Sequence, residues 1–189
     1  MFLKRFIIAA TMLFGFSAHA DSGFGFNLGI GLPYIGQGAI QYFFNDKFQV
    51  AVEYNNLDVD VDTAGVELTM PAIMAYYHPW GGSYFIGAGL GTQSLEATST
   101  DLGSGNQVTT EVDSMSTIIK TGWMWGKANG GFWFGIDVSY IMPSGDDVTI
   151  TAPGVPTNSQ AYLDAVEAAE DFGDTAYTNI TFARFGWMF

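Results

Sequence analysis

Residues 24–32 read FGFNLGIGL, and every second residue of this stretch is large and apolar. Because successive side chains of a β-strand point to opposite faces, the alternation predicts a strand with one apolar face and one small or polar face. The same alternation recurs seven more times, whereas no apolar run after residue 20 reaches the ~18 residues of a transmembrane helix. The sequence therefore predicts an all-β protein of eight strands.

Large apolar residues occupy alternate positions in each of the eight segments. These segments are 24–32, 40–44, 48–54, 66–76, 84–90, 115–125, 132–140 and 183–189. In 66–76 the alternation assigns the even-numbered residues, from Val66 to Tyr76, to the apolar face and Glu67 to the polar face. The expected sheet thus has one continuous apolar face.

Short and long connections alternate along the chain. Residues 45–47, 79–83 and 127–131 form short, turn-rich links, whereas the links 33–38, 57–65, 98–107 and 143–176 are longer or more acidic. Short turns at one end and longer loops at the other are typical of bacterial outer-membrane barrels. We therefore expect an eight-stranded antiparallel transmembrane β-barrel with short periplasmic turns and longer acidic external loops.

The composition of the two faces indicates which one meets lipid. A soluble barrel such as a lipocalin carries its apolar face inward and a charged face outward. Here the polar face consists mainly of Gly, Asn, Gln, Ser and Thr, and only 13% of the chain is charged. This face is too weakly charged for an exterior in water, so the apolar face is expected to meet lipid. Small inward residues also suit a narrow eight-stranded barrel.

The first twenty residues have the three parts of an export signal. They begin with a positive Lys4-Arg5 pair, continue with an apolar core over 6–16, and end on the small-x-small sequence AHA at 18–20. Cleavage after Ala20 is expected to leave residues 21–189 as the barrel domain.

The chain from residue 21 onward is strongly acidic. It holds four bases and all 19 acids, a net charge of −15, and it has no cysteine. Phosphate contacts need clustered Lys and Arg, so this balance excludes nucleic acid as a partner. Without disulfides, stability has to come from backbone pairing and packing.

Aromatic residues are expected at both membrane interfaces, where amphipathic rings are favoured. The predicted periplasmic girdle consists of Trp80, Trp123, Trp125, Trp133 and Trp187. The predicted external girdle consists of Tyr34, Tyr54, Tyr140 and Tyr177.

Five charged residues fall within the strands, and the alternation points all of them inward. They are Glu53, Glu67, Lys120, Asp137 and Arg184. A lipid-facing Lys or Arg at mid-depth would cost about 2–4 kcal/mol, which favours the lumen. We interpret the five as a network of three acids and two bases that plugs the lumen; the alternative interpretation is an ion-conducting path.

The end of the chain carries a family resemblance. Phe185, Trp187 and Phe189 resemble the terminal assembly signal of outer-membrane barrels, although Arg184 stands where that signal usually has glycine. The segment 84–91, which follows Tyr-Tyr-His-Pro at 76–79, is similar to a hairpin of the small OmpA-, OmpX- and OmpW-type barrels. The resemblance implies the outer membrane of a Gram-negative bacterium, contact with lipid and lipopolysaccharide, and insertion by the barrel-assembly machinery.

Few residues offer catalytic or metal-binding chemistry. After the signal the only histidine is His78, beside a periplasmic turn, so a lipid A-modifying enzyme is disfavoured. Asp58, Asp60 and Asp62 are spaced like the start of a calcium loop but lack the glycine and glutamate that such a loop needs, so they are a weak metal candidate. No cofactor is expected.

The long connection 143–176 contains an expected helix over about 159–172, with a polar face and an apolar face. It is expected to pack on the barrel rim, or to bind an extracellular partner together with the acidic loops.

Two functions remain open at this point. The first is a structural or surface-interaction role with a plugged lumen. The second is a narrow porin-like channel, or an OmpW-like conduit for small molecules, for which the glycine-lined inner faces of the first and fifth strands would leave room.

Overall fold

The computed structural model describes residues 22–61, 64–100, 106–127, 130–154, 166, 169 and 172–189. Its strands are β1 (Gly23–Leu32), β2 (Gly36–Phe43), β3 (Phe48–Val61), β4 (Ala64–Tyr77), β5 (Tyr84–Thr100), β6 (Gln107–Trp125), β7 (Gly131–Thr151) and β8 (Tyr177–Met188). Among the described residues no helix has the length and apolar character required to cross a membrane. The export signal lies outside the described residues, as does most of the expected loop helix, of which Val166, Ala169 and residues 172–174 are helical.

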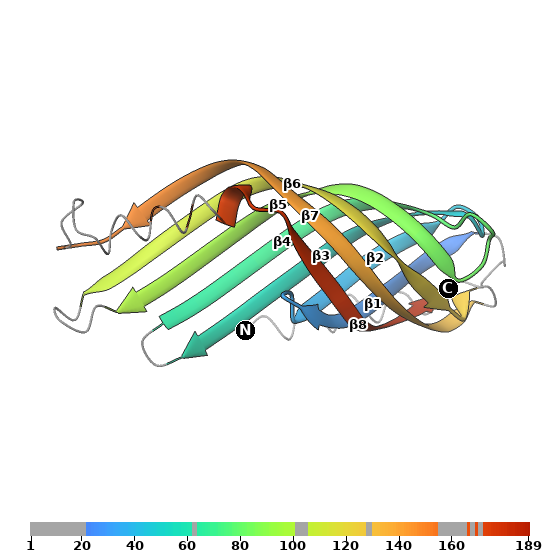
Figure 1. Cartoon of the computed structure of the whole chain (residues 1–189). Coiled ribbons are helices and arrows are strands. Elements are labelled where there is room, and N and C mark those ends of the chain that lie inside the picture. Colours follow the sequence, from blue (N-terminus) through green and yellow to red (C-terminus); the bar gives the residue numbers. More distant parts are fainter. Residues whose placement is uncertain are drawn as a thin grey trace.

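The eight strands form one closed barrel in which each strand pairs with its sequence neighbours and β1 pairs with β8 (Figure 1). All eight pairings are antiparallel. Gly25 of β1 is paired with Met188 of β8, so the start of the barrel and the end of the chain lie at the same rim. This confirms the predicted fold. Where each strand is flanked by two paired neighbours, closure provides partners for backbone N–H and C=O groups and removes the sheet edges. The pairing of β3 with β2 ends at Asn56 and that of β7 with β8 ends at Ile141.

The apolar face is outward in seven of the eight predicted segments. Their exposed residues include Leu28, Ile40, Val52, Leu90, Ile119, Phe132 and Phe185. The residues that alternate with them on the inner face, among them Asn27, Gln41 and Ser116, are buried. A sheet that exposes its large apolar side chains and buries its polar ones is suited to lipid and not to water.

The fourth segment has the opposite phase from the one predicted. Leu68, Met70, Met74 and Tyr76 are buried inside the barrel, while Ile73 on the other face is exposed. The prediction was wrong because both faces of this strand are apolar, so hydrophobicity alone could not decide between them. The pairing of β4 with β5 decides which residues of β4 face outward. Tyr77 is paired with the outward Ile86, and directly paired residues share a face.

The strands at the loop-rich end run further than predicted. The links after β1 and β3 cover only residues 33–35 and 62–63, because most of the expected loops 33–38 and 57–65 is strand. β3 to β7 have 14 to 21 residues, more than the roughly 9–11 that cross a membrane. These five strands project beyond β1 and β2, to the left in Figure 1. The acidic residues expected in loops, such as Asp58, Asp60 and Asp147, therefore lie on extended strands.

Candidate functional site

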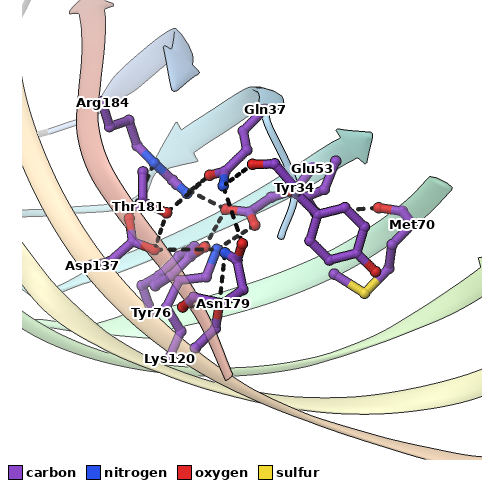
Figure 2. A network of polar contacts seen from close by, with 12 residues as sticks. Tyr34, Gln37, Glu53, Met70, Tyr76, Lys120, Asp137, Asn179, Thr181 and Arg184 are labelled. Atoms are coloured by element: carbon purple, nitrogen blue, oxygen red, sulfur yellow. Dashed lines mark hydrogen bonds and ion pairs between the residues drawn. The ribbon is translucent and has the colours of Figure 1, made fainter. Parts of the chain in front are cut away.

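Four charged side chains meet in the middle of the lumen (Figure 2). Lys120 Nζ lies 2.5 Å from Glu53 Oε2 and 3.9 Å from Asp137 Oδ1. Arg184 Nη1 lies 3.1 Å from Glu53 Oε1, and Arg184 Nε lies 3.2 Å from Asp137 Oδ2. The four residues are 3–5% exposed, so the ion pairs are shielded from bulk water. We call these four residues the charge network.

Polar side chains from other strands complete the charge network. The Tyr76 hydroxyl donates a hydrogen bond to Glu53 Oε1. Thr181 Oγ1 lies 2.8 Å from Asp137 Oδ1 and 2.9 Å from Gln37 Oε1, and Arg184 Nη2 donates to Gln37 Oε1 over 3.3 Å. The attraction within a buried ion pair offsets the cost of desolvation only where further hydrogen bonds reach the charged groups. Here the neutral partners lie on β2, β4 and β8, so six strands in all contribute side chains.

The two remaining strands contribute glycines where the network needs space. Gly29 of β1 is paired with both Gln37 and Arg184, and Gly87 of β5 is paired with both Tyr76 and Lys120. A Cβ atom at Gly87 would lie 2.8 Å from Tyr76 Cε1, too close for both to fit. At these two glycines, neighbouring side chains therefore lie in the space that a larger side chain would fill.

Glu67 is not part of the charge network, which corrects the prediction. It lies on the outward face of β4 and is exposed, since the phase of this strand is reversed. Without it the network has two acids and two bases and is electrically balanced. A third buried carboxylate would have lacked a cationic partner, which costs several kcal/mol.

A second group of contacts crosses the lumen between the charge network and the loop-rich end of the barrel. Tyr177 OH donates to Gln93 Oε1 over 2.6 Å, so the 2.6 Å contact between the Tyr34 and Tyr177 hydroxyls has Tyr34 as its donor. This chain connects the β1–β2 link and β8 with β5 on the opposite wall. Burial and the neighbouring Tyr177 raise the pKa of Tyr34 far above its usual value, so its hydroxyl stays protonated. We call these three residues the tyrosine strap.

Six of the nine residues predicted for the aromatic girdles lie on the outer face of the barrel. Trp80, Trp123, Trp125, Trp187, Tyr54 and Tyr140 are exposed on the outside of the barrel. Trp133 and Tyr34 are 0% exposed and Tyr177 is partly buried, so these three belong to the interior. Trp133 was misassigned because its neighbours Phe132 and Phe134 are aromatic too, and only the alternation separates them.

A third group of contacts lies at the rim of the short turns. The His78 ring is buried, with Nδ1 at 3.1 Å from the Tyr84 carbonyl oxygen and 3.2 Å from that of Gly82. Lys127 Nζ donates to the Asp46 carbonyl oxygen over 2.7 Å and so joins two turns from opposite sides of the barrel. Burial lowers the pKa of Lys127 to about 8.

The pH dependence of stability should report on His78. Burial, with a contribution from the positive Lys127, lowers the pKa of His78 from 6.5 to about 4. Between these values the unfolded chain takes up a proton that the folded barrel does not, so stability should fall as the pH drops from 6.5 toward 4 and should be unaffected by this residue above 6.5. The measurement is the urea midpoint of unfolding at pH 7.5 and pH 5. The His78→Gln variant should lose less on acidification; an equal loss in both proteins would contradict the assignment.

The other predicted site residues lie apart from the lumen. Phe185 and Trp187 point outward, and the Phe189 N–H donates to the Phe24 carbonyl oxygen over 2.8 Å. Their role as an assembly signal stays a prediction. Asp58 and Asp60 are exposed on β3, and Asp62 is outside the described residues. Within the described part of the chain, no three His, Cys, Asp or Glu side chains are placed to hold a metal ion.

Sequence reasoning missed the neutral partners of the charge network and of the tyrosine strap. Gln37 and Gln93 follow the alternation of their strands and face inward. They were missed only because the predicted strands were too short to include them. For Thr181 the alternation along the strand did not predict an inward side chain. The register of β8 shifts against both neighbours between Thr181 and Arg184, so two residues three positions apart both face inward.

Comparisons with known proteins agree on the fold. No protein-family model matches the sequence, and no curated protein matches it. The crystal structure of Acinetobacter baumannii CarO2 is similar with a TM-score of 0.50 and 12% identity, over 88% of this chain and 98% of that one. That of a major outer membrane protein from Thermus thermophilus has a TM-score of 0.56 and 10% identity, over 89% and 99%. The chain therefore has the eight-stranded barrel fold of small outer-membrane proteins.

Proposed function

We propose that this chain is an integral outer-membrane β-barrel of a Gram-negative bacterium, with a structural or surface-interaction role and a plugged lumen. The observation that carries the proposal is the balanced charge network, whose four members are 3–5% exposed and lie on four different strands. The outward apolar belt and its exposed Trp and Tyr residues support the location in lipid.

The charge network, the tyrosine strap and the contacts at the short-turn rim support a plug because they follow one another along the lumen. An ion that passed through would have to separate Lys120 from Glu53, cross the tyrosine strap, and displace the buried Trp133. Separating a buried ion pair costs about 3–5 kcal/mol, because each charge is left without its partner in a medium of low polarity. In this proposal the strength of the barrel and the absence of conduction have the same cause.

The projecting strands support a role at the cell surface. Asp58, Glu67, Glu96 and Glu111 are exposed and directly paired from strand to strand across β3 to β6. Like charges at directly paired positions are unfavourable, and a cationic neighbour would relieve their repulsion. The proposed partners are lipopolysaccharide through bridging cations, or an extracellular partner with a basic surface. The barrel-assembly machinery is the proposed partner during insertion.

The proposal is tested in cells by deleting the gene and restoring it. A structural role predicts that the deletion sensitises cells to detergent with EDTA, while uptake of small solutes stays the same. Restoring the wild-type gene should recover resistance. A deletion that slowed solute uptake and left detergent resistance intact would contradict the proposal and favour the conduit.

One observation favours the conduit as a second candidate. Leu57, Leu68, Leu95 and Val112 are aligned on the inner face of the projecting strands, each paired with the next. They give the external part of the lumen an apolar lining, which suits a small apolar molecule. Such a conduit would require the tyrosine strap and the charge network to open.

A lipid A-modifying activity stays disfavoured in our proposal. His78 lies at the short-turn rim, and the Ser139 hydroxyl is buried in the lumen at 3.5 Å from the Asn179 carbonyl oxygen. Neither position meets an outer-leaflet lipid. The test is mass spectrometry of lipid A from cells that overproduce the protein; a new or missing acyl chain would overturn this part of the proposal.

A further inference from the structure

Three buried amide side chains and His78 form a row of polar contacts across four neighbouring strands. The row begins at His78, directly after β4, and continues through Gln49 of β3 and Gln41 of β2 to Asn27 of β1. All four side chains belong to residues that are only 1–2% exposed. We call these four residues the amide chain.

The contacts of His78 determine which of its ring nitrogens can change protonation. Nδ1 lies 3.1 Å from the Tyr84 carbonyl oxygen and 3.2 Å from that of Gly82. Carbonyl oxygens only accept hydrogen bonds, so Nδ1 carries a hydrogen and Nε2 is the atom that gains or loses a proton. Nε2 lies 3.4 Å from Gln49 Oε1, which also only accepts. This contact is therefore a hydrogen bond only when His78 is protonated.

The other contacts of the amide chain have the matching direction. Gln49 Nε2 donates to Gln41 Oε1 over 3.3 Å, and Asn27 Nδ2 donates to the same oxygen over 3.3 Å. Gln41 Nε2 and Asn27 Oδ1 have no hydrogen-bond partner in the described structure. The far end of the amide chain thus has one spare donor and one spare acceptor, and these are what a reversal of its direction requires.

Loss of the proton from His78 Nε2 would place two acceptors opposite each other. A half-turn of the Gln49 amide removes this conflict but places its oxygen opposite Gln41 Oε1, so the Gln41 amide has to turn as well. The turned Gln41 then has its NH2 group opposite Asn27 Nδ2, so the Asn27 amide turns too. After the three half-turns Gln49 donates to His78, and Gln41 donates to both Gln49 and Asn27. Because an amide oxygen and an NH2 group have nearly the same size, the packing is retained.

We propose that the amide chain is a pH switch, in which protonation of His78 Nε2 at the short-turn rim reverses all three amides together. The structure has the orientation of the protonated form, and the reversed orientation belongs to neutral His78. The reversal exchanges the unpaired donor and acceptor at Gln41 and Asn27. Asn27 is one inward position away from Gly29, which is paired with Arg184 of the charge network. The inference goes beyond the proposed structural role and does not require that the lumen is closed.

Two charged residues on the other short turns act on His78 within the described part of the chain. The positive Lys127 disfavours a second positive charge on the ring, whereas the negative Asp46 favours it. The K127M variant should therefore move the titration midpoint of His78 to higher pH, and the midpoints of the three amides should move with it.

The test is an NMR titration of the full barrel in lipid nanodiscs from pH 7.5 to pH 3.5. It follows the ring nitrogens of His78 and the side-chain amides of Gln49, Gln41 and Asn27. The switch predicts one midpoint shared by the ring and the three amides. The amide of Gln93, which is equally buried but outside the amide chain, is the control and should show no step at that midpoint.

Two variants separate the switch from the titration of acids on the surface. H78Q removes the titrating ring, so the shared step of the amides should disappear. Q49L keeps His78 but removes the connection, so His78 should still titrate while Gln41 and Asn27 no longer follow it. The proposal is overturned if His78 does not titrate above pH 3.5, if the amides do not follow it in the wild-type barrel, or if Gln41 and Asn27 keep their step in either variant.

Discussion

Replacing Glu53 by glutamine should lower the free energy of unfolding by about 3–5 kcal/mol. Glu53 is the one acid that contacts both bases closely, at 2.5 Å from Lys120 Nζ and 3.1 Å from Arg184 Nη1. Without its charge two buried cations share the single carboxylate of Asp137. Urea unfolding of the barrel refolded in lipid vesicles, followed by tryptophan fluorescence, measures the change.

Two further variants make this prediction specific to the charge network. E67Q is chemically the same change on the exposed outer face of β4 and should cost less than about 0.5 kcal/mol. The double variant E53Q/K120M removes one acid with one base, so it should recover part of the stability lost in E53Q. Equal effects of E53Q and E67Q would contradict the network.

Replacing Gly186 by alanine should cost about 3 kcal/mol, the upper end of what overpacking usually costs. The indole of Trp133, which is fully buried, occupies the space over Gly186, and a Cβ atom there would overlap Cε2, Cζ2 and Nε1 of the ring. Neither the ring nor the strand can move without disturbing the closed sheet. The free energy of unfolding in urea measures the loss.

The matched control for Gly186 is Gly82. A Cβ atom at Gly82 would meet nothing within 4 Å, so G82A should be close to neutral. In W133F/G186A the smaller ring should accept the added methyl group, so this double variant should be more stable than the sum of the two single changes indicates. Strict additivity would show that Trp133 and Gly186 do not compete for the same space.

The barrel itself could be predicted from the sequence because a periodic signal and a compositional signal agree. The period-two alternation assigns the strands, and the poor charge of the polar face assigns the apolar face to lipid. The charge network followed from the same argument, because a charged residue in phase with the polar face has to point inward. Glu53, Lys120, Asp137 and Arg184 were all placed correctly in this way.

The failures have definite physical causes. β4 is apolar on both faces, so its phase was ambiguous, and Glu67 and Tyr76 were exchanged between lipid side and lumen. The bulge in β8 brings Thr181 and Arg184 to the same face, which no strict alternation predicts. Tyr34 and Tyr177 are near the loop-rich end of the barrel. Their hydroxyl contact bridges the barrel, however, and depends on a closure that sequence reasoning does not reach.

We expect the folded barrel to be closed to ions, and single-channel conductance in planar lipid bilayers can show whether it is. The protein without residues 1–20, refolded and verified as folded, should show no discrete openings at any voltage that the bilayer withstands. The barrel with E53Q should open at least occasionally, since its charge network is unbalanced. Reproducible openings of the wild-type barrel, with ion selectivity altered by a charge change at Lys120, would contradict the plug and make the same four residues the lining of a pore.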